Sequence, residues 1–140
     1  MRICLAVMAL VAAEGCSRSP LLVEGPVDLG PSPIVTRFER PMRVSGARWE
    51  ICFEFDRPGD SHDAEAIDAV LLADSGQRHP LVDSELDRRG EATVCRIGRI
   101  DAWEPGGRIE PEEKELRFVA VELSSAKWLR LRQIRGGSAS

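Results

Sequence analysis

Alternation of apolar and polar residues from position 48 to position 55 constrains the fold of this chain most strongly. Bulky apolar side chains occupy every second position of the segment, namely Trp49, Ile51, Phe53 and Phe55. A period of two is typical of a strand that buries one face of a sheet. Cys52 falls on the opposite, more polar face, which its partner strand must cover or adjoin. The segment therefore predicts the best-defined strand of the chain.

Shorter runs elsewhere show the same alternation. They span 34–38, 42–44, 93–100, 116–121 and 128–134, with Pro41 between the first two and turn residues at 124–127 before the last. The final two runs predict a β-hairpin. About six short strands separated by turns predict a mainly β fold, a small β-sandwich that is immunoglobulin-like in general shape.

The segment 61–73 has two interpretations. Ser61, the acidic residues after it and apolar residues at helical spacing predict one short helix near 62–72, which Gly76 would close. The alternative makes 69–73 a strand and 74–77 a hairpin turn. The helix is the preferred interpretation, and the strand remains open.

Length and charge limit the class of protein. A chain of 140 residues has room for one domain with one core. Its 43% hydrophobic and 30% charged residues are typical of a globular protein. The net charge of −4 argues against nucleic acid as a partner, because phosphate binding needs a concentrated basic surface.

The N-terminus has the pattern of an export signal. Arg2 supplies a positive charge, residues 3–13 form an apolar run, and Gly15 precedes Cys16. The run is shorter than the roughly 20 residues that a membrane-spanning helix needs. A buried N-terminal helix in a cytosolic protein is the alternative, but the run lacks an amphipathic period.

This segment resembles the signal of bacterial lipoproteins, which ends in a small residue followed by a modified cysteine. The resemblance implies removal of residues 1–15, lipidation of Cys16 and attachment to a membrane. Ser17 after the cysteine favours the outer membrane, facing the periplasm, over the inner membrane. Ordinary signal cleavage would instead give a secreted, non-lipidated protein. A second resemblance, to small proteobacterial lipoproteins of unknown function, implies a β-sandwich and rests on Val27-Asp28-Leu29 and Phe53-Glu54-Phe55.

The predicted organisation has four parts. Residues 1–15 are the signal peptide and 16–31 are the lipidated cysteine with a flexible, proline-containing tether. Residues 32–136 form a single β-rich domain, and 137–140 are a disordered tail. Within the tether, an edge strand at 21–23 is the alternative, since prolines are tolerated at the edge of a sheet.

Two cysteines, Cys52 and Cys95, remain after processing. An oxidising compartment would pair them, and the chain-entropy model assigns about 4 kcal/mol to closing a loop of this length. A metal pair with His62 or His79, or a redox couple, are the alternatives. The chain has no Cys-x-x-Cys spacing to support a redox couple.

The sequence offers few groups for catalysis or metal binding. Four neighbouring residues, Asp60, His62, Asp63 and Glu65, could in principle bind a metal, but their spacing matches no metal signature. We interpret them as the start of a helix, where acidic side chains are favourable. Hydrolase motifs and phosphate-binding glycine loops are absent from the sequence. We therefore predict no catalytic residue, no metal and no cofactor.

Partner binding is predicted at two places. Trp103 stands in a loop at 101–111, and the last strand carries Trp128, Arg130, Arg132 and Ile134 at alternate positions. Exposed Trp and Arg are typical of interfaces. The alternatives are that Trp103 covers the edge of the sandwich and that the arginines form a solvated face. We expect a membrane-anchored binding module, an adaptor, inhibitor or immunity-like protein that binds an envelope protein or glycan. A small envelope hydrolase is the alternative.

Overall fold

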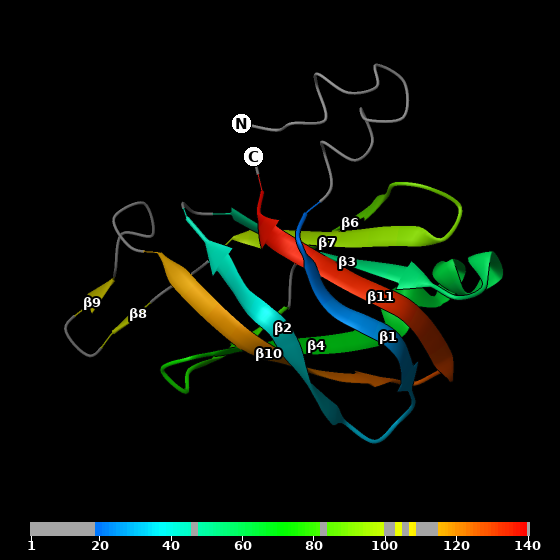
Figure 1. Cartoon of the computed structure of the whole chain (residues 1–140), viewed down its shortest axis with the longest axis horizontal. Coiled ribbons are helices and arrows are strands. Elements are labelled where there is room, and N and C mark those ends of the chain that lie inside the picture. Colours follow the sequence, from blue (N-terminus) through cyan, green and yellow to red (C-terminus); the bar gives the residue numbers. More distant parts are fainter. Residues whose placement is uncertain are drawn as a thin grey trace, which may run out of the picture.

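Two antiparallel β-sheets pack face to face in the computed structural model of the protein (Figure 1). The structure describes residues 19–45, 48–81, 84–99, 103–104, 107–108 and 115–139. Both the mainly β class and the sandwich architecture predicted above are confirmed.

Five strands make the first sheet, called sheet A. In spatial order they are β1 (Leu21–Leu29), β11 (Leu129–Ser138), β3 (Arg48–Phe55), β7 (Thr93–Arg99) and β6 (Glu85–Arg88). The other main sheet, sheet B, contains β2 (Ile34–Val44), β10 (Leu116–Ser125), β4 (Ile67–Ala73) and β5 (Arg78–Pro80). A 3-10 helix, η1 (Pro58–Ala66), follows β3, and β8 (Trp103–Glu104) pairs separately with β9 (Gly107–Arg108).

The core lies between the sheets. The four apolar side chains that alternate along β3 are buried, as their spacing predicts. From sheet B, Phe118 and Leu123 of β10 and Leu71 of β4 enter the same cluster and are fully buried. Because strands from both ends of the sequence enclose this cluster, the described part of the chain forms one core.

The helix expected near 62–72 is shorter, earlier and of a different kind. It ends at Ala66, and the chain continues as strand β4 from Ile67 to Ala73. In β4 the side chains of Ile67, Ala69, Leu71 and Ala73 are buried at alternate positions. The sequence of this segment fits both a helical and an extended period, and pairing with β10 extends from Ile67 to Ala73. The strand alternative is therefore the correct one.

The tether expected at 16–31 is also wrong for residues 21–29, which form β1. This strand pairs with β11 at the edge of sheet A and buries Leu22 and Leu29 completely. Pro26 lies within a register shift between Glu24 and Val27 on an edge strand, a position at which proline is tolerated.

The C-terminal boundary extends further than the expected end of the domain at residue 136. β11 runs to Ser138, so residues 137 and 138 of the expected tail belong to sheet A. Gly137 is buried opposite Glu50 of β3. In sheet B, the two strands expected around Pro41 form one strand, β2, with a register irregularity beside Phe118.

The strands of the sandwich run between two ends, called here the entry end and the distal end (Figure 1). At the entry end, defined by Ser19 and Ser138, the chain both enters β1 and leaves β11. At the distal end, defined by the turns at 30–33 and 126–128, β1 passes into β2 and β10 into β11. Both turns lead from one sheet to the other, so the hairpin expected from the runs 116–121 and 128–134 is wrong: β10 pairs with β2 and β4, and β11 pairs with β1 and β3. A hydrogen bond of 2.8 Å from Ser125 N to Gly30 O joins these two turns. The nine residues of β1 separate the ends by roughly 30 Å.

Candidate functional site

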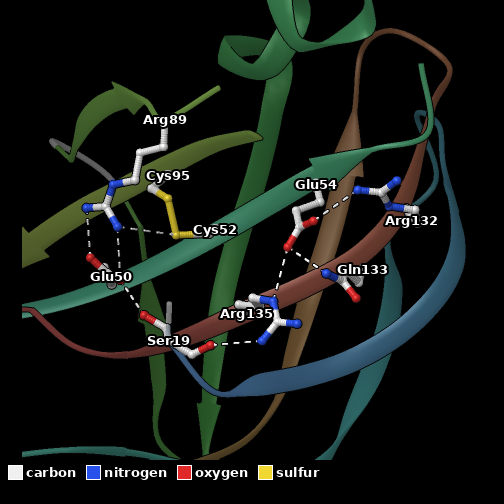
Figure 2. Close-up of polar contacts among 9 residues, drawn as sticks. All are labelled: Ser19, Glu50, Cys52, Glu54, Arg89, Cys95, Arg132, Gln133 and Arg135. Atoms are coloured by element: carbon white, nitrogen blue, oxygen red, sulfur yellow. Dashed lines mark hydrogen bonds and ion pairs between the residues drawn. A yellow bond between two sulfur atoms is a disulfide. The ribbon is translucent and has the colours of Figure 1, made fainter. Parts of the chain in front are cut away.

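The outer face of sheet A carries two buried carboxylates on either side of a disulfide (Figure 2). Glu50 and Glu54 of β3 are 7% and 3% exposed, although their positions face away from the apolar core. Cys52 lies between them and is bonded to Cys95, its direct neighbour on β7. The predicted pairing of Cys52 with Cys95 is confirmed.

Glu54 accepts three side-chain hydrogen bonds. They come from the guanidinium of Arg132 (Nη2 to Oε1, 3.2 Å), the guanidinium of Arg135 (Nε to Oε2, 3.1 Å) and the amide of Gln133 (Nε2 to Oε2, 2.6 Å). All three donors belong to β11, the neighbouring strand. Charged hydrogen bonds of this kind offset the cost of removing a carboxylate from water. Glu54 therefore fastens β3 to β11.

Glu50 forms a bidentate pair with Arg89. The two Nη–Oε distances are 2.9 and 3.2 Å, and the hydroxyl of Ser19 also donates to Glu50. Arg89 bonds Asp87 as well, at 2.9 Å. Hydrogen bonds to Glu50 and then to Asp87 raise the pKa of Arg89 above its ordinary value. Arg89 Nη1 also lies 4.0 Å from Cys52 Sγ, so one side chain covers both the carboxylate and the disulfide.

The hydrogen bonds to Glu50 and Glu54 bear on what these carboxylates can do. A general acid or a metal ligand needs a carboxylate oxygen free to meet its substrate or ion. Both oxygens of Glu50 and both oxygens of Glu54 already accept hydrogen bonds. Both carboxylates are thus engaged in holding together the outer face of sheet A.

The remaining titratable candidates lie apart. Among the described residues, no three His, Cys, Asp or Glu side chains come close enough to hold a metal ion. His62 is exposed on η1, whereas His79 of β5 stands edge-on to the Phe118 ring, with centroids 5.2 Å apart. Burial lowers the pKa of His79. His79 thus packs at the edge of the core, on the edge strand of sheet B.

Trp128 is the most exposed large apolar side chain in the described part of the chain. It is 79% exposed at the distal end. Its ring lies across Gly30, where an added Cβ would overlap the ring atoms. The absence of a side chain at Gly30 therefore lets the tryptophan rest on the β1–β2 turn with most of its surface open to solvent.

Arg130 and Arg132 are exposed on the same strand. Arg130 lies 3.6 Å from Asp28 and 4.0 Å from Asp56, while Arg132 reaches Glu54. The sequence-based expectation that Ile134 shares their face is wrong. A register shift between Leu131 and Gln133 turns the strand, and Ile134 is completely buried.

Two predicted site residues lie outside what the structure describes. Cys16 belongs to the segment before residue 19, and the side chain of Trp103 is not described, although its backbone forms β8.

Glu50, Glu54 and Arg89 were not predicted as a site. Their signal in the sequence is the pair of acids that flanks Cys52 at alternate positions of a strong strand. Neither family models nor curated proteins nor solved structures give a match to this chain.

Proposed function

We propose that this protein is a lipid-anchored binding module of the bacterial envelope that contacts its partner through the distal end. The anchor is Cys16, and residues 1–15 are the signal that is removed. This proposal rests on the apolar run that ends at Gly15-Cys16 and on the cysteine pair, since disulfides are typical of exported proteins. In the described residues, the structure contains no helix long and apolar enough to cross a membrane.

The exposure of Trp128 carries the proposal of binding. Tryptophan is highly buried on average in folded proteins, and interfaces use it as an anchor because one ring buries a large apolar area. Ile34 and Val35, at the start of β2, are 36% and 56% exposed and lie at the same end of the sandwich. The distal end therefore presents an apolar surface without a partner in the described chain.

Polar groups border this surface. Arg130 with Asp28 and Asp56, and Lys127 with Asp63, form ion pairs at distances of 3.5 to 4.0 Å. Exposed ion pairs of this kind contribute little to the stability of the fold. Their side chains can therefore leave each other and bind a partner with little loss of free energy. An apolar centre surrounded by positively and negatively charged side chains fits an envelope protein as partner. It also fits a glycan whose ring stacks on the indole and whose hydroxyl groups donate hydrogen bonds to the carboxylates.

Position also supports this assignment. An anchor at Cys16 would attach the sandwich at its entry end, where Ser19 begins the described chain. The distal end then faces away from the bilayer, roughly 30 Å further out. It is the face that a partner in the periplasm would meet first.

Site-specific photocrosslinking in cells tests the proposed interface. A photoreactive phenylalanine replaces Trp128 in the full chain, and the matched control places it at Leu86, which is 41% exposed on the edge strand β6. We expect a discrete crosslinked species from position 128 only. Excess purified domain should suppress it, whereas the Trp128→Ala domain should compete at least tenfold less well. Equal crosslinking at both positions, or none at position 128, would contradict the proposal.

A further inference from the structure

The first described residues are fixed tightly to the sandwich. The hydroxyl of Ser19 donates to Glu50, and its carbonyl accepts a hydrogen bond of 3.2 Å from Arg135 Nη1. The carbonyl of Pro20 accepts from Gly136 N at 3.0 Å. Ser19 and Pro20 are therefore held against the sandwich before β1 begins at Leu21.

This attachment shortens the distance to the proposed anchor. Only Ser17 and Arg18 separate Ser19 from Cys16, and three Cα–Cα steps span at most about 11 Å. A lipidated Cys16, which is part of the proposed function, would thus hold the entry end directly against the headgroups. The sixteen-residue tether expected from the sequence would have allowed the domain to stand clear of the membrane.

A cleft of about 840 Å³ lies at the entry end. Its charged lining consists of Arg40, Arg43, Arg89 and Glu50. Glu50 and Asp87 pair with Arg89, and Glu115 pairs with Arg43, so Arg40 supplies the lining charge that no described carboxylate offsets. Met42 and Ile97 contribute apolar surface beside these groups. The cleft thus combines cationic groups with an apolar lining at the end of the molecule where the chain enters.

The arginines of this end differ in how fully they are paired. Arg89 is held by Glu50 and Asp87, and Arg43 forms an exposed pair with Glu115 at 3.2 Å. In the described part of the chain, no carboxylate lies within ion-pair distance of Arg40, or of Arg99 at the end of β7. Both side chains are exposed, and they are the cations most available to a ligand.

We infer that the entry end is a docking surface for anionic phospholipid headgroups, with the cleft as the place where a headgroup phosphate is bound. Guanidinium groups match phosphate oxygens in geometry and charge. Basic residues close to an anionic membrane each strengthen binding about fivefold. The surface would orient the sandwich so that β1 points away from the bilayer and Trp128 is presented outward. The inference rests on the proposed function for the position of the membrane.

Vesicle binding without the lipid anchor tests this inference separately from lipidation. The chain from position 16 with Cys16→Ser keeps every core residue, since the core cluster extends from Leu22 to Ile134. It is sedimented with phosphatidylcholine vesicles that contain 30% phosphatidylglycerol or none. We expect binding only to the anionic vesicles, and a decrease of that binding with ionic strength.

Two double variants each remove two positive charges, one at the entry end and one elsewhere on the domain. Arg40→Gln with Arg99→Gln should weaken binding about 25-fold. The control, Arg37→Gln with Arg57→Gln, alters two exposed arginines that belong to the middle of β2 and to the start of η1, and should weaken it less than twofold.

Three results would overturn the inference. They are absence of binding to anionic vesicles, equal losses in the two double variants, and full competition by millimolar glycerol phosphate, which would indicate a site for a free phosphate ligand. A labelled Cys16 together with any of these results would leave the proposed anchor intact and remove only the headgroup site.

Discussion

Replacing both Cys52 and Cys95 with alanine will lower the free energy of unfolding by about 4 kcal/mol. The bond joins neighbouring strands β3 and β7 and closes a loop with a sequence separation of 43. A cross-link of that separation removes about 4 kcal/mol of loop entropy from the unfolded chain. Alanine is the suitable replacement because both positions are buried, and serine would introduce hydroxyl groups that need partners.

Urea unfolding in the presence and absence of dithiothreitol measures this effect. Reductant should lower the midpoint of the wild-type domain to that of the double variant, and the double variant itself should not respond. A wild-type midpoint that stays unchanged when mass spectrometry shows two free thiols would contradict the stabilising role of the bond.

Glu54→Ala is expected to destabilise the domain by about 2 to 3 kcal/mol, the range for removing one partner of a buried charged network. The change leaves Arg135 and Gln133 without their carboxylate on a strand that is central to sheet A. The side chain of Arg132 is 62% exposed and can turn to solvent when the carboxylate is removed. The decrease in the free energy of unfolding therefore stays below that expected for breaking a fully buried ion pair.

The control for Glu54 is Glu122→Ala. Glu122 pairs with Arg78 at 2.6 Å, but this pair lies on the exposed side of sheet B and should contribute less than about 1 kcal/mol. Urea unfolding of both variants at neutral pH gives the comparison. Equal destabilisation would show that the burial of Glu54 adds nothing to its contribution.

Strong local patterns were sufficient to predict the architecture. The alternation along β3 identified the buried face, and two further alternating runs identified strands β10 and β11. The hairpin expected from those two runs was wrong, because β10 belongs to sheet B and β11 to sheet A. The disulfide was predictable from the two cysteines that the proposed processing would leave, because in an exported domain these thiols would have only each other as partners.

Segments with weak or double patterns could not be assigned in the same way. The apolar residues of β4 satisfy both a helical and an extended period, and only pairing with β10 decides between them. β1 contains Pro26 and follows a proline, a composition typical of a linker, yet Leu22 and Leu29 are needed to close the core. Such choices depend on contacts with strands that are distant in sequence.

The candidate site shows the same division. Exposure of Arg130 and Arg132 was predictable, because alternate positions of a strand share a face. The same rule was wrong for Ile134, which is buried, and Trp128 lies in the turn before β11. Burial of Glu50 and Glu54 was not predictable, since their cover comes from Arg89, Arg135 and Ser19 in other parts of the chain.

Metabolic labelling with palmitate tests the proposed membrane anchor most directly. Cells of a lipoprotein-processing bacterium express the full chain, its Cys16→Ala variant and the matched Cys4→Ala variant, whose cysteine lies within the proposed signal. Our account predicts label in the wild type and in Cys4→Ala, and complete loss of label in Cys16→Ala. Label that persists in Cys16→Ala, or a wild-type protein that is exported without label, would contradict it.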